Sequence, residues 1–231
     1  MRAGEVSEVS QDYLKAIWSA REWGGDPMTA TELARRFGTT KANVTEVLKR
    51  LDELGLINRV PYRPPELTAA GETIAVSMVR RHRLIETFLV ESLGYSWDEV
   101  HDEAESLEHA ASDLLIDRID AFLGHPGADP HGDPIPGPDG DVESHDSSLL
   151  LAEAGPGTHT VLRVSDADPE VLAVLAEVGL RPGATVEVVS GAGEGRSGPS
   201  GAGDSGPVEL SVDGGATIEV ESAAASAVYL A

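Results

Sequence analysis

The chain has 231 residues, which is enough for two domains with hydrophobic cores of their own. It contains no cysteine, which excludes disulfides and thiolate metal sites and fits a reducing cytoplasm. The formal net charge of −23 seems to exclude a nucleic-acid partner, but residues 1–83 contain 13 Lys/Arg and 11 Asp/Glu, whereas the rest contains 4 and 29. The first third can therefore approach DNA while the acidic remainder faces elsewhere. We expect no membrane partner, because neither an apolar run of membrane-spanning length nor a secretory signal is present.

Residues 8–23 form the first predicted helix, with apolar side chains at helical spacing from Val9 to Ala20 and a Gly24-Gly25 end. Asp12 lies near its start, where an acid in solvent is already favoured by the helix dipole. A metal-binding role for Asp12 therefore needs support from elsewhere in the chain.

A helix-turn-helix is predicted next. Thr29 and Glu32 form a capping box for a short helix that ends at Gly38, and a longer helix follows from about residue 41 to 54. Residues 55–68 then indicate two short strands around a basic, proline-rich tip, which is typical of a winged-helix domain. The alternative is an ordinary helical hairpin with a solvated face.

The second helix has small, polar and basic side chains at its front, which allow a helix to enter a major groove. Asn43 and Glu46 can contact base edges, and basic and hydroxyl side chains can contact phosphates. The expected DNA-binding residues are Thr39, Thr40, Lys41, Ala42, Asn43, Glu46, Lys49, Arg50, Arg59 and Arg63.

The middle of the chain contains clustered imidazoles and carboxylates. A long helix over residues 68–93 places His82 and Glu86 on one face. The helix that follows presents, at i, i+4, i+7 and i+8, the residues His101, Glu105, Glu108 and His109. Such a face is costly to bury unless a cation sits on it, and divalent first-row metals suit these donors. The alternative is a solvated acidic helix with incidental histidines.

A further amphipathic helix over residues 114–123 gives this region more apolar surface than a winged-helix domain needs. Self-association is the economical explanation, because a homodimer matches two-fold DNA half-sites.

The last part of the chain begins with a segment rich in Pro, Gly and Asp, residues 124–154, in which we expect solvated histidines at His125, His131 and His145. From residue 157 a strand-like pattern predicts a small β-barrel that contains one helix, opened by Asp168-Pro169 and closed by Gly179. The role of the Gly-rich loop 191–207 stays open.

The segments 81–86 (RHRLIE) and 101–109 (HDEAESLEH), in this order and separation, resemble the diphtheria-toxin-repressor family of metal-dependent transcriptional repressors. The segments 132–137 and 180–183 resemble the same family, so the resemblance covers nearly the whole chain. It implies an α+β fold in three parts: a winged helix-turn-helix (1–74), a helical metal-binding and dimerisation domain (75–140) and, after a linker (141–156), an SH3-like or FeoA-like small β-barrel (157–231).

The resemblance also implies two metal sites in each subunit. One would contain His82, Glu86 and His101, and the other Asp12, Glu105, Glu108 and His109. In some members the barrel adds an acid to the first site. The matching residue here is Asp168, with Glu170 aligned less well, although Asp168 is equally well placed to cap its own helix.

The expected metal is Mn²⁺, with Fe²⁺ as the alternative. Iron-responsive members typically have Met near the position of Asp12 and Cys at that of Glu105, whereas both are hard oxygen donors here. The manganese branch often has another acid one turn after Asp12, but this chain has Lys15 or Ala16 there. The two-metal cluster of that branch is therefore not carried over.

The expected function is that of a cytoplasmic, homodimeric repressor with Mn²⁺ as its co-repressor. One or two dimers would bind a pseudo-palindromic double-stranded DNA operator, and the regulated genes would be those of manganese uptake. A metallohydrolase is the alternative from another class, since clustered His and carboxylates can hold catalytic metals. We expect that the protein is not an enzyme, because its sequence shows neither a nucleophile on a loop nor an evident substrate-pocket signature. A metal-buffering protein would have no use for a DNA-reading helix.

Overall fold

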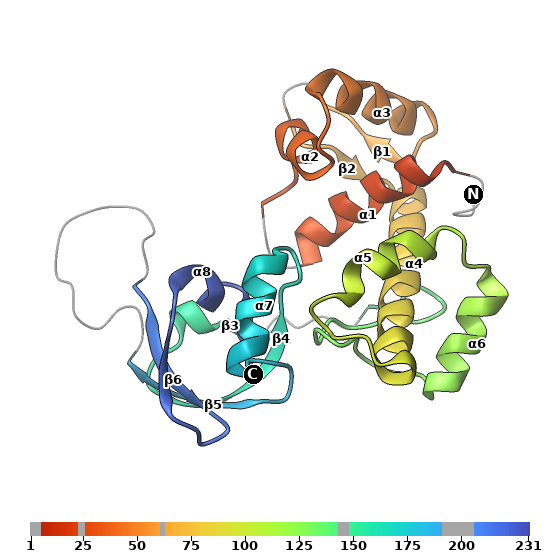
Figure 1. Cartoon of the computed structure of the whole chain (residues 1–231). Helices are drawn as coiled ribbons and strands as arrows, with labels where there is room; N and C mark the ends of the chain where they lie inside the picture. Colours follow the sequence, from red (N-terminus) through yellow and green to blue (C-terminus); the bar gives the residue numbers. More distant parts are fainter. Residues whose placement is uncertain (1–5, 23–25, 61–62, 143–147, 191–205) are drawn as a thin grey trace, which may run out of the picture. The chain divides into compact units, whose positions relative to one another are not determined.

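The computed structural model describes residues 6–22, 26–60, 63–142, 148–190 and 206–231. It divides into two compact units, whose helices and strands are labelled in Figure 1. The first comprises residues 1–82, 107–116 and 135–142, and the second residues 83–106, 117–134 and 143–231. None of the helices in the described ranges is long and apolar enough to cross a membrane.

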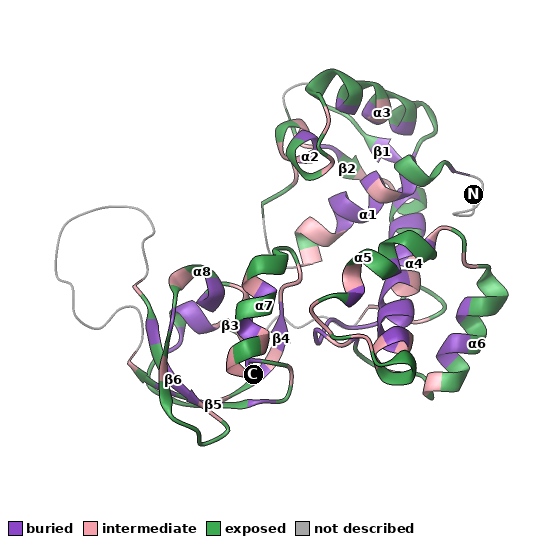
Figure 2. Cartoon of the chain, viewed as in Figure 1, coloured by how far each residue is buried: buried purple, intermediate pink, exposed green. Residues whose placement is uncertain are grey.

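The first unit contains the predicted winged helix-turn-helix, which is confirmed. Its elements are α1 (Glu8–Glu22), α2 (Ala30–Arg36), α3 (Lys41–Glu53) and the antiparallel pair β1 (Ile57–Asn58) and β2 (Glu66–Leu67). The capping box forms, because Thr29 N donates to Glu32 Oε2 at 2.6 Å and Glu32 N donates to Thr29 Oγ1 at 3.3 Å. One core joins the three helices to the strand, with Leu14, Leu33 and Leu51 fully buried (Figure 2).

Helix α4 (Ala69–Phe88) packs closely against this core at Gly71, in its first turn. A Cβ atom at Gly71 would lie 2.0 Å from the carbonyl oxygen of Leu56, so only glycine permits this approach of α4 to the residue before β1. The helix continues as a π-helical turn over Leu89–Leu93 and ends at Gly94, whose φ is 76°. The single predicted helix is therefore an α-helix with a wider last turn.

Helices α5 (Val100–Glu108) and α6 (Asp113–Leu123) complete the helical part of the chain. The buried stripe of α5 runs through Val100, Ala104 and Glu108 at i, i+4 and i+8. A carboxylate therefore takes the last buried position of this stripe, and that makes α5 the element on which a metal site can be built.

The second unit contains the C-terminal domain, an antiparallel sheet in the order β3-β8-β4-β5-β6-β7. The strands are β3 (Leu149–Leu150), β4 (Gly157–Val164), β5 (Thr185–Ser190), β6 (Val208–Val212), β7 (Thr217–Val220) and β8 (Val228–Leu230), with helices α7 (Pro169–Val178) and α8 (Ser222–Ala225). Alternation along β5 buries Val186 and Val188 in the domain's core (Figure 2). The predicted β-domain is confirmed. Most of loop 191–207, the Gly24-Gly25 helix end and His145 lie outside the described residues.

Candidate metal sites and nucleic-acid interface

Asp12, Glu108 and His109 come together in the first unit, and we call them the Asp12 group. Asp12 belongs to the first turns of α1, while Glu108 ends α5 and His109 follows it directly. His109 Nε2 lies 2.8 Å from Asp12 Oδ1 and 3.6 Å from Glu108 Oε1. The three can offer ligand atoms within 4.8 Å of one another, which fits a common ion.

Gln11 fixes the orientation of the His109 ring. Its amide Nε2 donates to the carbonyl oxygen of Val6 at 2.9 Å, so Oε1 is the atom 2.9 Å from His109 Nδ1. The Nδ1–H of His109 therefore donates to Gln11, and Nε2 faces Asp12. A hydrogen bond to the second ring nitrogen is the arrangement that metal-binding histidines commonly have.

Glu108 is almost fully buried and accepts hydrogen bonds from two sides. Lys15 Nζ donates to Oε1 at 2.7 Å and to Oε2 at 2.9 Å, and His82 Nδ1 donates to Oε2 at 2.6 Å. Burial by itself would raise the pKa of Glu108, but the His82 hydrogen bond and the charge of Lys15 outweigh it and hold the pKa below its usual value. Lys15 and His82 therefore stabilise the ionised form of this carboxylate.

A second collection of possible ligands lies in the second unit: Glu86, His101, Asp129, His131 and Asp166, here called the Glu86 cluster. Glu86 is buried on α4. His101 Nδ1 lies 3.3 Å from Glu86 Oε1 and 3.1 Å from Asp166 Oδ2, an acid between β4 and α7. Burial lowers the pKa of His101, but hydrogen bonds and charges from Asp166 and Glu86 outweigh it and raise the pKa to about 10.

His131 is fully buried, so the prediction of a solvated loop histidine is wrong. Its Nε2 donates to the carbonyl oxygen of Trp97 at 2.6 Å, which leaves Nδ1 facing Glu86 Oε2 at 3.7 Å. Asp129 Oδ1 accepts from His131 N at 2.8 Å and from Asp133 N at 2.9 Å, and so shapes the loop around the ring. His125, by contrast, has an exposed side chain that contacts Asp120.

The loop that carries His131 is anchored on strand β4. Val164 N donates to the carbonyl oxygen of His131 at 2.8 Å, and Arg163 forms an ion pair with Asp133 at 3.0 Å. Gly132 has a φ of +87°, and a Cβ atom there would lie 2.3 Å from the carbonyl oxygen of Leu162. The imidazole is therefore held in place by the C-terminal domain as well as by its own loop.

The remaining predicted ligands are His82, Glu105 and Asp168. His82 lies one turn before Glu86 on α4, as the helical spacing predicts, and its Nδ1 also contacts Glu108 of the Asp12 group. Glu105 has a half-exposed side chain, 3.8 Å from His101 Nε2. Asp168 is exposed and caps α7, with Oδ1 accepting from Glu170 N at 3.0 Å and Val171 N at 3.3 Å. The acid that approaches His101 is Asp166, two residues earlier.

Three residues of the Glu86 cluster were missed by the sequence interpretation. Asp129 and His131 stand in a loop whose Asp-Pro-His-Gly-Asp sequence resembles an ordinary turn. Asp166 precedes the stronger helix-capping signal of Asp168-Pro169. The concentration of acids around a single histidine was the available signal for the loop, and an acid just after the β4 segment was the signal for Asp166.

Both collections fit a divalent metal. Every donor is an imidazole nitrogen or a carboxylate oxygen, which suits Mn²⁺ and Fe²⁺ better than soft metals. His131 Nδ1 is buried and has no hydrogen-bond partner among the residues that the structure describes. A bound cation would supply that missing partner.

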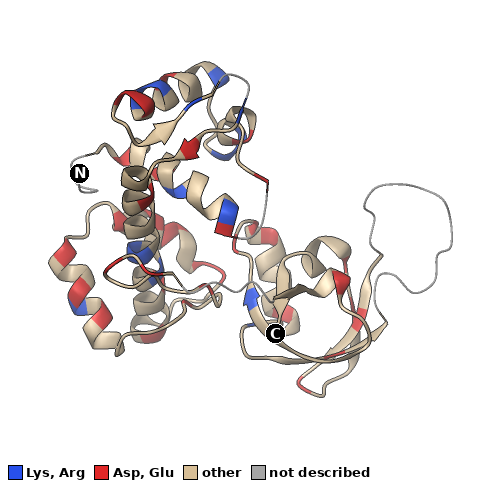
Figure 3. Cartoon of the chain, turned by 180° about the vertical axis from the view of Figure 1, so that it is seen from behind, with Lys and Arg blue, Asp and Glu red and all other residues tan. Residues whose placement is uncertain are grey.

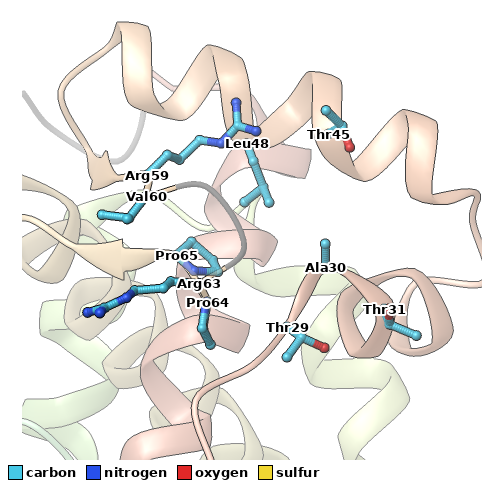
Figure 4. A pocket seen from close by; sticks show the side chains of 10 residues that line it. All are labelled: Thr29, Ala30, Thr31, Thr45, Leu48, Arg59, Val60, Arg63, Pro64 and Pro65. Atoms are coloured by element: carbon cyan, nitrogen blue, oxygen red, sulfur yellow. The ribbon is translucent and has the colours of Figure 1, made fainter.

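The predicted DNA-binding residues lie on α3, in the turn before it and on the wing. Thr40 caps α3 by accepting from Asn43 N at 3.2 Å, and the Asn43 side chain donates to Thr39 Oγ1 at 2.9 Å. A cavity of about 430 Å³ opens between α2, α3 and the wing, with Arg59 and Arg63 in its lining (Figure 4). Lys and Arg lie mainly on the first three helices, the wing and α4, whereas Asp and Glu predominate on α6 (Figure 3). The predicted DNA-binding residues thus present hydroxyl, amide and basic groups to a nucleic acid.

The chain begins with a winged helix-turn-helix, continues with helices that carry clustered imidazoles and carboxylates, and ends with an antiparallel β-domain. Together these features define a metal-responsive DNA-binding protein. Family models match three consecutive segments: the N-terminal DNA-binding domain of iron-dependent repressors at residues 5–64, their metal-binding and dimerisation domain at 68–137, and a FeoA domain at 149–196. A solved manganese-dependent transcriptional repressor in complex with manganese is 43% identical, covers 96% of this chain and 98% of its own, and superposes with a TM-score of 0.84. The chain belongs to the diphtheria-toxin-repressor family of metal-dependent transcriptional repressors.

Two further relatives are named for other metals. The structure of ScaR with bound Cd²⁺ is 32% identical, covers 96% of this chain and 98% of its own, and has a TM-score of 0.78. The iron-dependent repressor IdeR of Mycobacterium bovis is 35% identical over 133 residues, 58% of this chain. The chain matches 57% of the length of that curated relative.

Proposed function

We propose that this protein is a transcriptional repressor activated by a divalent metal ion, with Mn²⁺ as its co-repressor. The observation that carries the proposal is the Asp12 group, in which an acid from the first helix of the winged-helix domain meets Glu108 and His109 of α5. An ion held by this group would fix α1, and with it the reading helix α3, in one position.

The proposal assigns two metal sites to each subunit. Asp12, Glu108 and His109 would hold one ion, with His82 beside Glu108. Glu86, His101 and Asp166 would hold the other, and Asp129 and His131 adjoin Glu86. A bound ion supplies the positive charge that lets several carboxylates and neutral imidazoles converge. Hydrogen bonds between His109 and Gln11, between His131 and Trp97 and within the loop at Asp129 would hold these donors in a fixed geometry.

Manganese is proposed because the donors of both groups are carboxylate oxygens and imidazole nitrogens, none of them soft, and the chain contains no cysteine. The similarity to a manganese-dependent repressor over nearly the whole chain supports this choice. Fe²⁺ remains the alternative, because the iron-dependent repressor IdeR is a partial relative and Fe²⁺ accepts the same donors.

The proposed target is a pseudo-palindromic operator of manganese-uptake genes, bound by one or two homodimers in the cytoplasm, where the chromosome is accessible. On α6, Leu114 and Phe122 have exposed fractions of 63% and 71%, which favours association of two subunits through this helical region. We place the functional boundaries at residues 1–74, 75–140 and 157–231, joined by a linker at 141–156.

The proposal is tested by selecting duplexes from a random DNA library with the Mn²⁺-loaded protein and then measuring affinity for the selected duplex. Anaerobic fluorescence anisotropy with Mn²⁺, Fe²⁺ or a chelator compares the metals directly. We expect tight binding with Mn²⁺ and weak binding with the chelator. Equal affinity without metal would overturn the co-repressor role, and activation by Fe²⁺ alone would reverse the metal assignment.

A further inference from the structure

Lys15 occupies an unusual place in the Asp12 group. It lies on α1 one turn after Asp12, is only 7% exposed, and holds both carboxylate oxygens of Glu108 at 2.7 and 2.9 Å. A lysine is rarely buried to this extent, because its ammonium loses hydration that only a close anion can replace. Lys15 is therefore buried because its ammonium pairs with Glu108, and it does not belong to the solvated face of α1.

The contact also places a cation on a carboxylate that the metal group itself uses. Glu108 is 1% exposed, so little water screens its charge, and it receives a second hydrogen bond from His82. A divalent ion bound by Asp12, Glu108 and His109 would have to share the Glu108 carboxylate with Lys15, which already offsets its charge. Two cations on one buried carboxylate repel each other, so the ammonium opposes a metal ion there.

Resting on the function proposed above, we propose that Lys15 acts as a built-in cation of the Asp12 group. It stabilises Glu108 when no metal is bound and competes with a metal ion for this carboxylate. It thereby raises the Mn²⁺ concentration needed to fill the Asp12 group. Lys15 is in this sense a determinant of the metal threshold, and it is not itself a ligand.

The experiment is isothermal titration calorimetry of the full-length, metal-free protein with Mn²⁺ alone. The variant Lys15→Gln removes the charge and keeps a polar side chain. We expect its Mn²⁺ affinity at the Asp12 group to rise about tenfold or more without a change in stoichiometry. The variant Lys15→Glu puts a carboxylate in place of the ammonium, and we expect its Mn²⁺ affinity also to exceed that of wild type. The binding event that belongs to the Asp12 group is identified as the one that disappears in the variant His109→Ala.

Two controls separate charge from structure. Lys15→Arg keeps the cation and should keep the wild-type stoichiometry, with affinity within about threefold. Arg21→Gln removes one charge from an exposed position of the same helix and should change neither quantity. Thermal unfolding without metal gives an independent readout, since Lys15→Glu should melt lower than wild type and regain stability with Mn²⁺.

The inference is overturned if Lys15→Gln and Lys15→Glu bind Mn²⁺ with wild-type affinity at the Asp12 group, while both variants retain the wild-type circular dichroism spectrum. Failure of the proposed function looks different. In that case the wild-type protein itself would show no Mn²⁺ isotherm that His109→Ala removes.

Discussion

Gln11 determines which nitrogen of His109 faces Asp12. The two residues are 98 positions apart in the sequence, yet Gln11 Oε1 lies 2.9 Å from His109 Nδ1. The amide cannot turn around without losing its hydrogen bond to Val6, so the ring is held with Nε2 toward the acid at 2.8 Å. The winged-helix domain therefore contributes an orienting group as well as a candidate ligand to the same site.

Replacing Gln11 by Leu should weaken Mn²⁺ binding at the Asp12 group by about 10- to 100-fold, because the Nδ1–H of His109 loses its acceptor and the ring its fixed orientation. Calorimetry with Mn²⁺ measures this directly. Glu8→Gln, at an exposed position of the same helix, is the matched control and should bind like wild type. An unchanged isotherm for Gln11→Leu would show that the ring needs no such support.

Asp166 and Asp168 should have opposite effects. Asp166→Ala is expected to weaken Mn²⁺ binding at the Glu86 cluster, because the acid beside His101 is lost, with little change in the cap of α7. Asp168→Ala should leave Mn²⁺ binding unchanged and lower stability by about 1 kcal/mol, the usual contribution of a helix N-cap.

Calorimetry and thermal unfolding of both variants check this pair. If Asp168→Ala lost metal binding while Asp166→Ala kept it, the role that we give to Asp166 would pass to Asp168, as the sequence resemblance implies.

Gly132→Ala should destabilise the protein by roughly 1–3 kcal/mol, because a φ of +87° disfavours any side chain and the new Cβ would collide with the carbonyl oxygen of Leu162. The shift of the loop should also displace His131 and weaken Mn²⁺ binding at the Glu86 cluster. The melting temperature and calorimetry report the two effects.

The control for this variant is Gly127→Ala, in the same loop region but with no atom within 4 Å of its Cβ position. We expect it to remain within about 0.5 kcal/mol of wild type, as is usual for surface substitutions. Equal stability of the two variants would mean that loop 129–133 can move away from β4 at little cost.

Arg63→Ala should lower DNA affinity by a similar factor for all sequences and reduce the slope of log K against log salt by about 1, because we expect this exposed arginine of the wing to bind the phosphate backbone. Anisotropy titrations at several salt concentrations measure the slope. Arg21→Ala, at an exposed position of α1 before the helix-turn-helix, serves as the control. A sequence-dependent loss with an unchanged slope would instead indicate that Arg63 reads bases.

The fold was accessible from the sequence wherever a local signal determines an element. The capping box at Thr29 and Glu32, the cap and proline that open α7, and the alternation of β5 all indicate structure within a few residues. The π-helical turn after Phe88 had no such signal, because it changes only how the last turn of a helix is wound.

The candidate sites were accessible only in part. Helical spacing alone places His82 near Glu86 and His101 near Glu105, and the resemblance to the family added Asp12. Asp166 and His131 reach Glu86 through loops whose paths depend on packing against β4, and no short-range pattern encodes such a path. The pairing of Lys15 with Glu108, 93 positions later, likewise follows from tertiary packing.

The central claim is that one divalent ion, held by Asp12 of the winged-helix domain together with Glu108 and His109, switches DNA binding on. The most direct test is an Mn²⁺ titration of operator-duplex binding, by fluorescence anisotropy, for wild type and Asp12→Ala. Wild type should gain affinity as Mn²⁺ is added, while Asp12→Ala, folded and dimeric like wild type, should stay at its metal-free affinity at Mn²⁺ concentrations that saturate wild type. Full activation of Asp12→Ala at the same Mn²⁺ concentrations would contradict the claim.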